Sequence, residues 1–497
     1  MVFFYLLSGL FLGWSLGAND TGNVFGAAVE TRMLRFKRAA LVASIFIVLG
    51  ALLEGGGPSG TLGRLGTVDA LGGAFTVSLA AGLAILVVVR TRIPVSTSQT
   101  IVGAILGWNF FAGRLTDFRS LLNIAVSWIT AFVVSGVVAA LLFYLFRRWI
   151  NRSRRHLLEQ DMLVRYGLVI FGALGAYYLG ANNIANVVGV FVPVTPFKDL
   201  AIGSLFVFTG VQQLYLVGAL SVVVGIYTYS HRVMRTVGQD LFKMSPVTAL
   251  AALIAETFVL FIFTSRGLQN LLLSLGLPAI PLVPVSSTQV IVGAVMGIGL
   301  AKGGKNIRYN VLGRLSLAWI VAPVLAFLFS FVALFITQNV FELQVQRPIS
   351  YTVDKAAVRE IKSRGIDTNN LSFVNLRSFD SQRAFYRELT EDGAYEPEVA
   401  KEIVSICEDH PLKVDVKTLV DRGLDVRFTP AQMEALAELD GREFRRKWEL
   451  ESALAGYEAW QPVEDPQTSE EEDRNSFLRD RLAILHNIFY DPLPQSE

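Results

Sequence analysis

The sequence predicts an all-α polytopic membrane protein with a soluble, mainly helical C-terminal domain. Long apolar segments before residue 340 and an abrupt rise in charge after it indicate this fold class. Residues 1–339 contain ten acidic and 24 basic side chains, whereas residues 340–497 contain 32 and 20. Charged residues are thus about 10% of the first part, against about 25% in soluble domains. Such a composition excludes a soluble one-domain enzyme and favours a chain that crosses a bilayer repeatedly.

Two different motifs recur in the same order along the apolar part. Residues 17–24 (GANDTGNV) recur as residues 180–187 (GANNIANV), and residues 94–99 (PVSTSQ) recur as residues 284–289 (PVSSTQ). Internal duplication with interrupted segments at matching places is typical of secondary transporters. We therefore predict an inverted-repeat secondary transporter with discontinuous helices and two re-entrant hairpins.

Basic clusters give the orientation, because short cytoplasmic loops are rich in Lys and Arg. They lie at residues 32–38, 147–165, 231–243 and 302–308. If all four face the cytoplasm, each half has three spans and one hairpin, so the second half is inverted and residue 340 lies outside. The predicted parts are a first transmembrane repeat (1–165), a second, inverted transmembrane repeat (166–339) and a soluble acidic C-terminal domain (340–497).

The first motif interrupts an apolar segment that is too short to cross a bilayer. Residues 2–18 are apolar, and residues 17–23 add Asn19, Asp20 and Asn23. This pattern predicts a broken helix with polar backbone at membrane depth, where only a protein-lined or wet environment tolerates it. Carboxylate and amide oxygens are ligands for hard cations. Close helix packing by Gly and Ala is the alternative interpretation.

The second motif precedes two apolar stretches, 99–112 and 289–301, that are also too short to span. We interpret them as arms of re-entrant hairpins whose tips are rich in hydroxyl groups. Ser and Thr before a helix act as N-caps, and a helix N-terminus inside a membrane also attracts anions. Two such tips that converge suit a tetrahedral oxyanion. Asp20 would repel that anion unless a cation lay between them, which is a physical reason for cotransport.

Other ionisable residues are few. Glu256 lies in the middle of an apolar segment, where a charge is costly. It indicates a cation or proton site, with a structural pairing as the alternative, whereas Glu54 at a segment end can reach the interface. The single cysteine, Cys407, excludes an intramolecular disulfide and a cysteine-based metal centre. We find no catalytic constellation and expect no enzyme activity and no cofactor.

Together, the four motifs resemble those of the inorganic phosphate transporter (PiT) family over about residues 1–339. That family has a Gly-Ala-Asn-Asp signature and a Pro-Val-Ser-Thr-Thr-type hairpin tip in both halves. The resemblance implies a cell-membrane symporter of inorganic phosphate with sodium, or with protons in some bacterial members. It assigns phosphate ligands to Ser96, Thr97, Ser98, Gln99, Asn183, Ser286, Ser287, Thr288 and Gln289. It assigns sodium ligands to Asn19, Asp20, Asn23, Asn182, Asn183, Asn186 and Glu256.

Several positions depart from the family pattern. Asn183 replaces an Asp, Ile47 stands where the family often has Glu, and Gln99 and Gln289 stand where many members have His. Fewer protonatable groups favour sodium over protons as the coupling ion. A proton- or metal-coupled phosphate or sulfate permease and an ion channel remain the alternatives. We expect phosphate, sodium and lipid as partners and no nucleic acid, and a homodimer is possible. For the tail we expect a solvated appendage, with a regulatory or dimerising role as the alternative.

Overall fold

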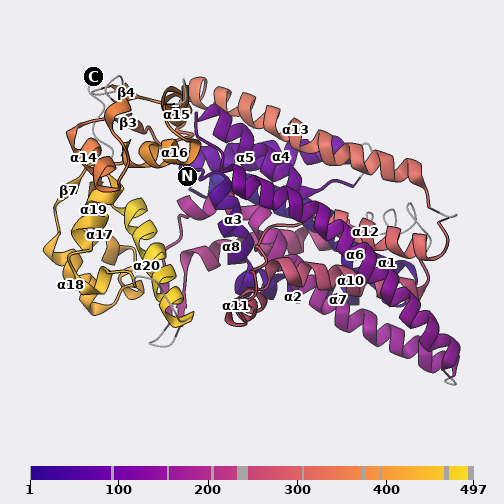
Figure 1. The fold of residues 1–497 in the computed structure, drawn as a ribbon. Helices are drawn as coiled ribbons and strands as arrows, with labels where there is room; N and C mark the ends of the chain where they lie inside the picture. Colours follow the sequence, from indigo (N-terminus) through magenta and orange to yellow (C-terminus); the bar gives the residue numbers. More distant parts are fainter. Residues whose placement is uncertain are drawn as a thin grey trace. The chain divides into compact units, whose positions relative to one another are not determined.

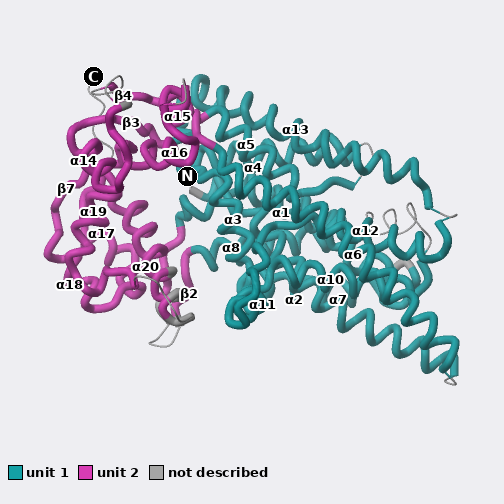
Figure 2. Tube along the Cα trace, viewed as in Figure 1, with its two compact units in different colours: residues 1–111, 116–196, 211–346 teal, residues 112–115, 197–210, 347–497 magenta. Residues whose placement is uncertain are grey.

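The structure is a computed structural model that describes residues 2–90, 94–153, 156–202, 206–231, 244–304, 307–371, 377–391, 394–463 and 469–490. Figure 1 shows these residues as a largely helical fold. The chain divides into two compact units, coloured separately in Figure 2. Unit 1 comprises Met1–Phe111, Thr116–Pro196 and Val211–Gln346. Unit 2 comprises Ala112–Leu115, Phe197–Gly210 and Arg347–Glu497.

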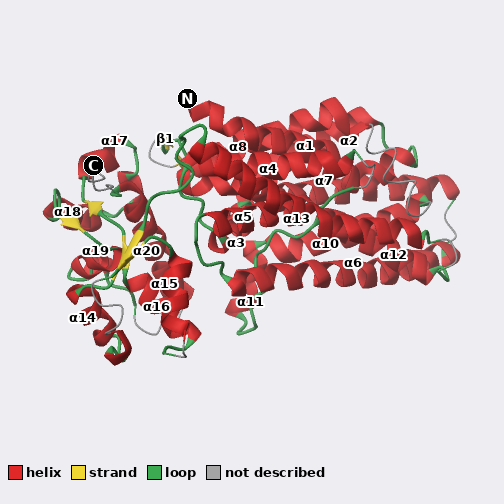
Figure 3. Ribbon diagram, turned by 90° about the horizontal axis from the view of Figure 1, so that it is seen from above, coloured by secondary structure: helices red, strands yellow, loops and turns green. Residues whose placement is uncertain are grey.

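Unit 1 is built from helices, which Figure 3 shows in red. Seven helical segments of the described chain are long and apolar enough to cross a membrane. The helices of this part are α1 (Val2–Glu30), α2 (Phe36–Glu54), α3 (Gly56–Leu65), α4 (Leu71–Val89), α5 (Thr97–Phe111), α6 (Phe118–Arg152), α7 (Leu157–Val188), η1 (Gly189–Val194), α8 (Gly210–Gly225), η2 (Ile226–Ser230), α10 (Pro246–Thr264), α11 (Arg266–Ser274), α12 (Ser287–Ala301) and α13 (Tyr309–Asn339).

The long helix α6 presents apolar side chains outward and small ones inward. Leu122, Val126, Ile129 and Val133 are at least half exposed and recur at helical spacing, while the buried face includes Ser127, Ala131 and Ser135. α13 repeats this arrangement, with Ile320, Val324, Leu328 and Val332 outward. An extended apolar stripe of this kind would be a liability in water and is stable against lipid.

Both helices that contain the Gly-Ala-Asn motif are continuous, so the predicted break at residues 17–23 is wrong. α1 runs without interruption from Val2 to Glu30, and α7 runs from Leu157 to Val188. Asn and Asp unwind a helix by competing for its backbone hydrogen bonds. Here their side chains bond to other side chains and to other elements, so the helices persist. The discontinuities lie elsewhere, at Gly55 between α2 and α3 and in the extended segments before α5 and α12.

Two hairpins bring the Pro-Val-Ser tips beside these helices. Phe4 of α1 stacks on Phe75 of α4 with ring centroids 5.4 Å apart, and Gly82 of α4 faces Phe11. α4 therefore runs parallel to α1 and ends level with the motif of α1. The next helix, α5, packs back on α4. α10 runs parallel to α7 in the same way, and α12 packs on α10.

The two halves interlock through the helices that follow the hairpins. α6 follows the first hairpin but packs on α12 and α10, whereas α13 follows the second and packs on α5 and α4. Glycines permit these contacts. A Cβ atom on Gly103 would lie 2.2 Å from the carbonyl oxygen of Pro323, and one on Gly293 would lie 2.2 Å from that of Phe132. The same kind of contact thus occurs at corresponding positions of both halves.

Unit 2 contains helices and three small antiparallel sheets, with strand orders β1–β2, β4–β3–β5 and β6–β7. Its helices are α14 (Lys355–Ser363), η3 (Asn369–Leu371), α15 (Gln382–Thr390), α16 (Pro397–Ile406), α17 (Val416–Asp421), η5 (Asp425–Arg427), α18 (Pro430–Glu438), α19 (Lys447–Leu454), η6 (Glu458–Trp460) and α20 (Ser469–Ile488). Its strands are β1 (Leu200–Ile202), β2 (Phe206–Phe208), β3 (Ser350–Thr352), β4 (Ser378–Phe379), β5 (Glu408–Asp409), β6 (Leu412–Lys413) and β7 (Glu443–Phe444).

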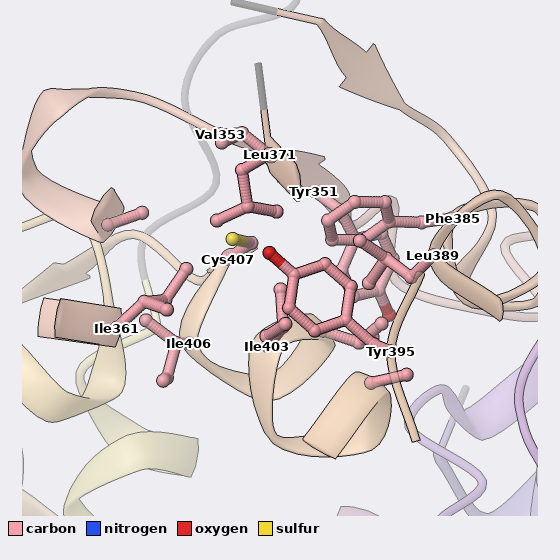
Figure 4. Packing of buried hydrophobic residues seen from close by; sticks show 13 residues of the cluster. Tyr351, Val353, Ile361, Leu371, Phe385, Leu389, Tyr395, Ile403, Ile406 and Cys407 are labelled. Carbon is pink, nitrogen blue, oxygen red and sulfur yellow. The ribbon is translucent and has the colours of Figure 1, made fainter. Parts of the chain in front are cut away.

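Two apolar cores organise unit 2. Lobe A is the part around the core from Tyr351 to Cys407, and lobe B is the part around the core from Leu412 to Phe489. Figure 4 shows the core of lobe A, in which the sulfur of Cys407 lies among Leu371, Ile403 and other apolar side chains. Cys407 has no exposed surface.

We expect a methyl group at Gly180 to destabilise unit 1. A Cβ atom there would lie 2.2 Å from the carbonyl oxygen of Ile47, so Gly180→Ala forces α2 and α7 apart. Overpacking of this kind costs about 1–3 kcal/mol. The matched control is Gly63→Ala in α3, where a Cβ atom would meet nothing within 4 Å. The apparent melting temperature of the detergent-solubilised protein should fall for Gly180→Ala only, and equal values would contradict the packing described for α2 and α7.

Candidate substrate and ion site

The four sequence motifs meet in one buried network inside unit 1. Their residues come from α1, α7 and the first turns of α5 and α12, with the extended residues just before those turns. Asn19 is half-buried, and the other residues assigned from the sequence are at most 7% exposed. These buried residues are Asp20, Asn23, Ser96, Thr97, Ser98, Gln99, Asn182, Asn183, Asn186, Glu256, Ser286, Ser287, Thr288 and Gln289.

Asp20 links the two halves. Its Oδ1 accepts a hydrogen bond from Asn19 Nδ2 (2.9 Å), and its Oδ2 accepts one from Asn183 Nδ2 (3.0 Å) of α7. The Ser287 hydroxyl at the start of α12 is a third polar neighbour of Asp20. These partners are two amides and a hydroxyl, none of which has a positive charge. The network therefore orients the carboxylate without neutralising it.

Each motif helix binds the backbone of its own hairpin tip. Asn182 donates to the carbonyl oxygen of Val285 (2.8 Å) and accepts from the Val285 amide (2.9 Å), while Asn19 donates to the carbonyl oxygen of Val95 (3.5 Å). The tips also bond each other, because Ser98 Oγ donates to Val285 O (3.0 Å) and Thr288 Oγ1 donates to Val95 O (3.4 Å).

The Val95 and Val285 carbonyls were missed by the sequence assignments, which considered side chains only. A signal for them exists in the chain. The first helical hydrogen bonds of α5 and α12 are accepted by the Ser96 and Ser286 carbonyls, so the carbonyl oxygen of the valine before each serine has no partner within the helix. Such a carbonyl is free to accept from Asn, Ser or Thr, and both valines do so here.

Further bonds cross between the halves. Asn186 Nδ2 of the second motif donates to Ser98 Oγ of the first tip (2.9 Å), and Asn23 Nδ2 of the first motif donates to Ser287 Oγ of the second tip (3.3 Å). Each motif therefore contacts both tips, which makes the network depend on the interlocked arrangement of the two halves.

The first turns of α5 and α12 have the capping bonds expected from their sequences. Ser96 Oγ accepts from the Gln99 amide (3.3 Å), and Ser286 Oγ accepts from the Gln289 amide (3.2 Å). The Oε1 atoms of Gln99 and Gln289 are buried and have no hydrogen-bond partner among the described residues. Two helix N-termini and two unused acceptors thus belong to one small region of the protein.

Glu256 of α10 is the second carboxylate of this region. It has no exposed surface, and neither of its carboxylate oxygens has a hydrogen-bond partner in the described part of the chain. It lies close enough to Asp20 for their charges to interact. Two neighbouring buried carboxylates are strongly unfavourable unless a cation or a proton accompanies them. The donor set of carboxylate, amide and hydroxyl oxygens fits an alkali cation.

Two of the four positions that depart from the family pattern lie together. Asn183 and Ile47 both line a small pocket, whose other lining residues are apolar: Leu16, Ala51, Leu179, Gly180, Ile184, Ala219 and Val222. None of the residues that line this pocket is acidic. Glu54 accepts from the amide of Arg266 at the start of α11 (3.1 Å), which is a structural contact. Of the basic clusters, residues 154–155, 232–243 and 305 lie outside the described residues.

The chain is similar to several known proteins. The family model described as "Phosphate transporter family" matches residues 16–330 and 280–366. A Methanocaldococcus jannaschii protein named a putative phosphate permease is 28% identical over 66% of this chain and 95% of its own length. A Chlamydia pneumoniae protein with the same description is 23% identical, over 69% of this chain and 99% of its own length.

Among solved structures, one titled "The sodium-dependent phosphate transporter" matches with a TM-score of 0.54 at 20% identity, over 68% of this chain and 98% of that chain. At this identity the match supports the fold alone. The relatives are named as permeases and not as enzymes. The apolar spans, the outward apolar stripes and the matched family agree. This chain therefore belongs to the phosphate transporter family and is a multi-pass integral membrane protein.

Proposed function

We propose that the protein imports inorganic phosphate together with sodium by alternating access. The observation behind this proposal is the buried network around Asp20 and Glu256, in which the two carboxylates have no cationic side chain as partner among the residues that the structure describes. The matched structure is that of a sodium-dependent phosphate transporter, and this description is consistent with the same choice of ion.

Sodium is expected to bind between the carboxylates and the amide oxygens. Asp20 and Glu256 supply negative charge, and Asn19, Asn23, Asn182, Asn183 and Asn186 supply neutral oxygen atoms. Because α1 and α7 are continuous helices, the motif carbonyls are used in helical hydrogen bonds. Side chains, together with the Val95 and Val285 carbonyls, are then the available ligands.

Phosphate is expected at the first turns of α5 and α12. Backbone amides and hydroxyl groups at a helix N-terminus bind oxyanions without a fixed positive charge. Gln99 and Gln289 add buried acceptors, to which an oxyanion can donate only if it retains an O–H group. Phosphate retains a P–OH group near neutral pH and sulfate does not, so these residues favour phosphate over sulfate.

The two charges also explain obligatory coupling. An anion beside the Asp20 carboxylate is repelled in a low-dielectric site. Sodium bound there removes the repulsion and attracts the anion, so each ligand strengthens the binding of the other. Binding free energies are reciprocal in this way by thermodynamic necessity.

We further propose that residues 1–165 and 166–339 are inverted repeats, each with a re-entrant hairpin. The parallel course of α4 beside α1 and of α10 beside α7 supports hairpins that turn at the depth of the motifs. The interlocked packing of α6 on α12 and of α13 on α5 supports two related halves around one site. Rocking of one half against the other would then open the site to alternate sides.

Asp20→Asn is expected to abolish sodium-dependent uptake. The change removes the negative charge that attracts the ion while keeping the size of the side chain. The measurement is accumulation of labelled phosphate in proteoliposomes with and without an inward sodium gradient. Asp161→Asn is the matched control, because Asp161 is exposed and pairs with Arg165 in the same helix. Accumulation driven by a pH gradient alone, without sodium, would exclude sodium coupling.

The combined change of Ser96→Ala and Ser286→Ala is expected to raise the phosphate concentration for half-maximal uptake at least tenfold. Each lost hydrogen bond to a charged group costs roughly 1.5–3 kcal/mol, and about 1.4 kcal/mol corresponds to a factor of ten. Ser44→Ala is the control, because Ser44 is buried in α2 and bonds only within its helix, to Ala40 O. An unchanged half-saturation concentration would show that the phosphate site lies elsewhere.

The C-terminal domain is proposed to lie on the extracytoplasmic side. The segments 112–115 and 197–210 belong to unit 2. α6 starts after the first segment and ends within the basic cluster at residues 147–165. α7 starts within the same cluster and leads to the second segment. α13 likewise starts after residues 302–308 and continues through Pro323 to Asn339 without a break. All three connections to unit 2 thus leave helices at the ends opposite to the basic clusters.

Labelling of introduced thiols tests this placement. Cys407 cannot serve as the probe, because it is buried and burial raises the pKa of its thiol to about 12. In intact spheroplasts, a membrane-impermeant maleimide should label Glu398→Cys, whose native side chain is 86% exposed. Arg148→Cys, at an exposed position of the basic cluster, should react only after permeabilisation, and the parent protein should not react. The opposite pattern would place the tail in the cytoplasm.

A further inference from the structure

We propose that the C-terminal domain is an autoinhibitory clamp on the transport cycle that joins the chain leaving α5 to the chain between α7 and α8. This inference rests on the proposed alternating-access transport. Unit 2 includes the segments Ala112–Leu115 and Phe197–Gly210 in addition to the tail. Each of these segments connects helices of unit 1.

Lobe A holds the first segment mainly through its backbone. The Leu115 amide donates to Gln382 Oε1 (2.8 Å), and the Gly113 carbonyl accepts from the Arg383 amide (2.9 Å) and from Ser381 Oγ (3.2 Å). Arg383 also reaches the Arg114 carbonyl (3.3 Å). Gly113 has a positive φ of 65°, and a Cβ atom there would lie 2.4 Å from Ser381 Oγ. The fit therefore needs glycine at this turn.

Lobe B holds the second segment through a buried ion pair. Both Asp199 oxygens bind the Arg427 guanidinium, with Nη2 at 2.9 Å from Oδ1 and Nε bonded to Oδ2. The Asp199 side chain is only 2% exposed, and its Oδ1 also accepts from the Gly210 amide at the start of α8 (2.6 Å). Lys198 adds a bond to the Asp421 carbonyl (2.8 Å).

The two lobes are tied to each other by buried polar contacts. Arg446, whose side chain is 1% exposed, lies beside Asp354 (3.0 Å) and Asp409 (3.4 Å) and donates to the Thr352 carbonyl (3.1 Å). Trp448 Nε1 donates to the Ile406 carbonyl (3.0 Å). Because the lobes are joined, the two segments that they hold are kept at a fixed separation.

Chain connectivity transmits this restraint to the candidate site. Segment 112–115 follows directly on α5, whose first turn contains Thr97, Ser98 and Gln99. Asp199 lies between α7, which contains Asn182, Asn183 and Asn186, and α8. Alternating access requires movement of one half relative to the other. A clamp across α5 and the α7–α8 connection opposes that movement.

The direction of the effect follows from the state in which the clamp is formed. In this structure the side chains proposed to bind phosphate and sodium are buried, and the contacts of unit 2 with both segments are formed. Contacts made in one state and lost in others stabilise that state and slow departure from it. The clamp therefore favours the closed site, and its release increases the maximal rate of uptake.

The test uses full-length protein in proteoliposomes with Arg427→Ala, Gln382→Ala and the double variant. We expect each single change to raise the maximal uptake rate at least twofold with the half-saturation concentration for phosphate unchanged. The maximal uptake rate of the double variant should not exceed that of either single variant, because a clamp released at one end no longer restrains the movement of the two halves. Arg422→Ala is the control, since Arg422 is an exposed residue close to Arg427. Unchanged or reduced rates in both single variants, or additive effects in the double variant, would overturn the proposal.

Hydrogen exchange provides a readout that does not depend on transport. Arg427→Ala should speed amide exchange in peptides that cover residues 206–215, because Asp199 loses the partner that fixes it beside Gly210. Exchange in the core of lobe A should stay as in the parent protein, which shows that the tail remains folded. Unchanged exchange at 206–215 would overturn the clamp even where uptake is normal. If the parent protein takes up no phosphate, the proposed function fails while this exchange result still stands on its own.

Discussion

The arrangement of unit 1 depends on the burial of the Asp20 carboxylate without a positively charged side chain. In a low-dielectric interior such a group needs oriented dipoles, and here they come from Asn19, Asn183 and Ser287. These donors belong to α1, α7 and α12, so the carboxylate is satisfied only when both halves come together. Asn183 is suited to this role because an amide donates to Asp20, whereas a second carboxylate at that position would repel it.

Glycines make this convergence sterically feasible. Gly17 and Gly180 stand at corresponding places, and a Cβ atom on either would collide with a carbonyl oxygen of the neighbouring helix, Val222 or Ile47. The first glycine of the motif thus serves close packing, while its Asn and Asp residues serve the polar network. Close packing, which the sequence offers as an alternative interpretation, accounts for the glycines of the motif, whereas ligand binding is proposed for its Asn and Asp residues.

The repeat made the residues of the site predictable, but not their connections. Residue type and spacing identified Asp20, the asparagines and the two tips, and the structure brings all of them together. The crossed pairs, such as Asn186 with Ser98, could not be predicted, because they depend on the interlocked packing of α6 and α13. The expected helix break was wrong because polar side chains unwind a helix only when they lack better partners. Val95 and Val285 take part in the network through their backbone carbonyl oxygens, which the assignment of side-chain ligands did not include.

In a segment this poor in acidic residues, five of the ten carboxylates can be given a specific role. Asp20 and Glu256 lie at the candidate site, while Glu54 accepts from the amide of Arg266 at the start of α11 and Asp117 caps α6. Asp199 pairs with Arg427 of the tail. A protein surface covered by lipid needs no charged side chains for solubility. An acidic residue in such a region is therefore expected to have a specific partner. The buried pairing of Asp199 with Arg427 joins the chain between α7 and α8 to the tail within unit 2, as the proposed clamp requires.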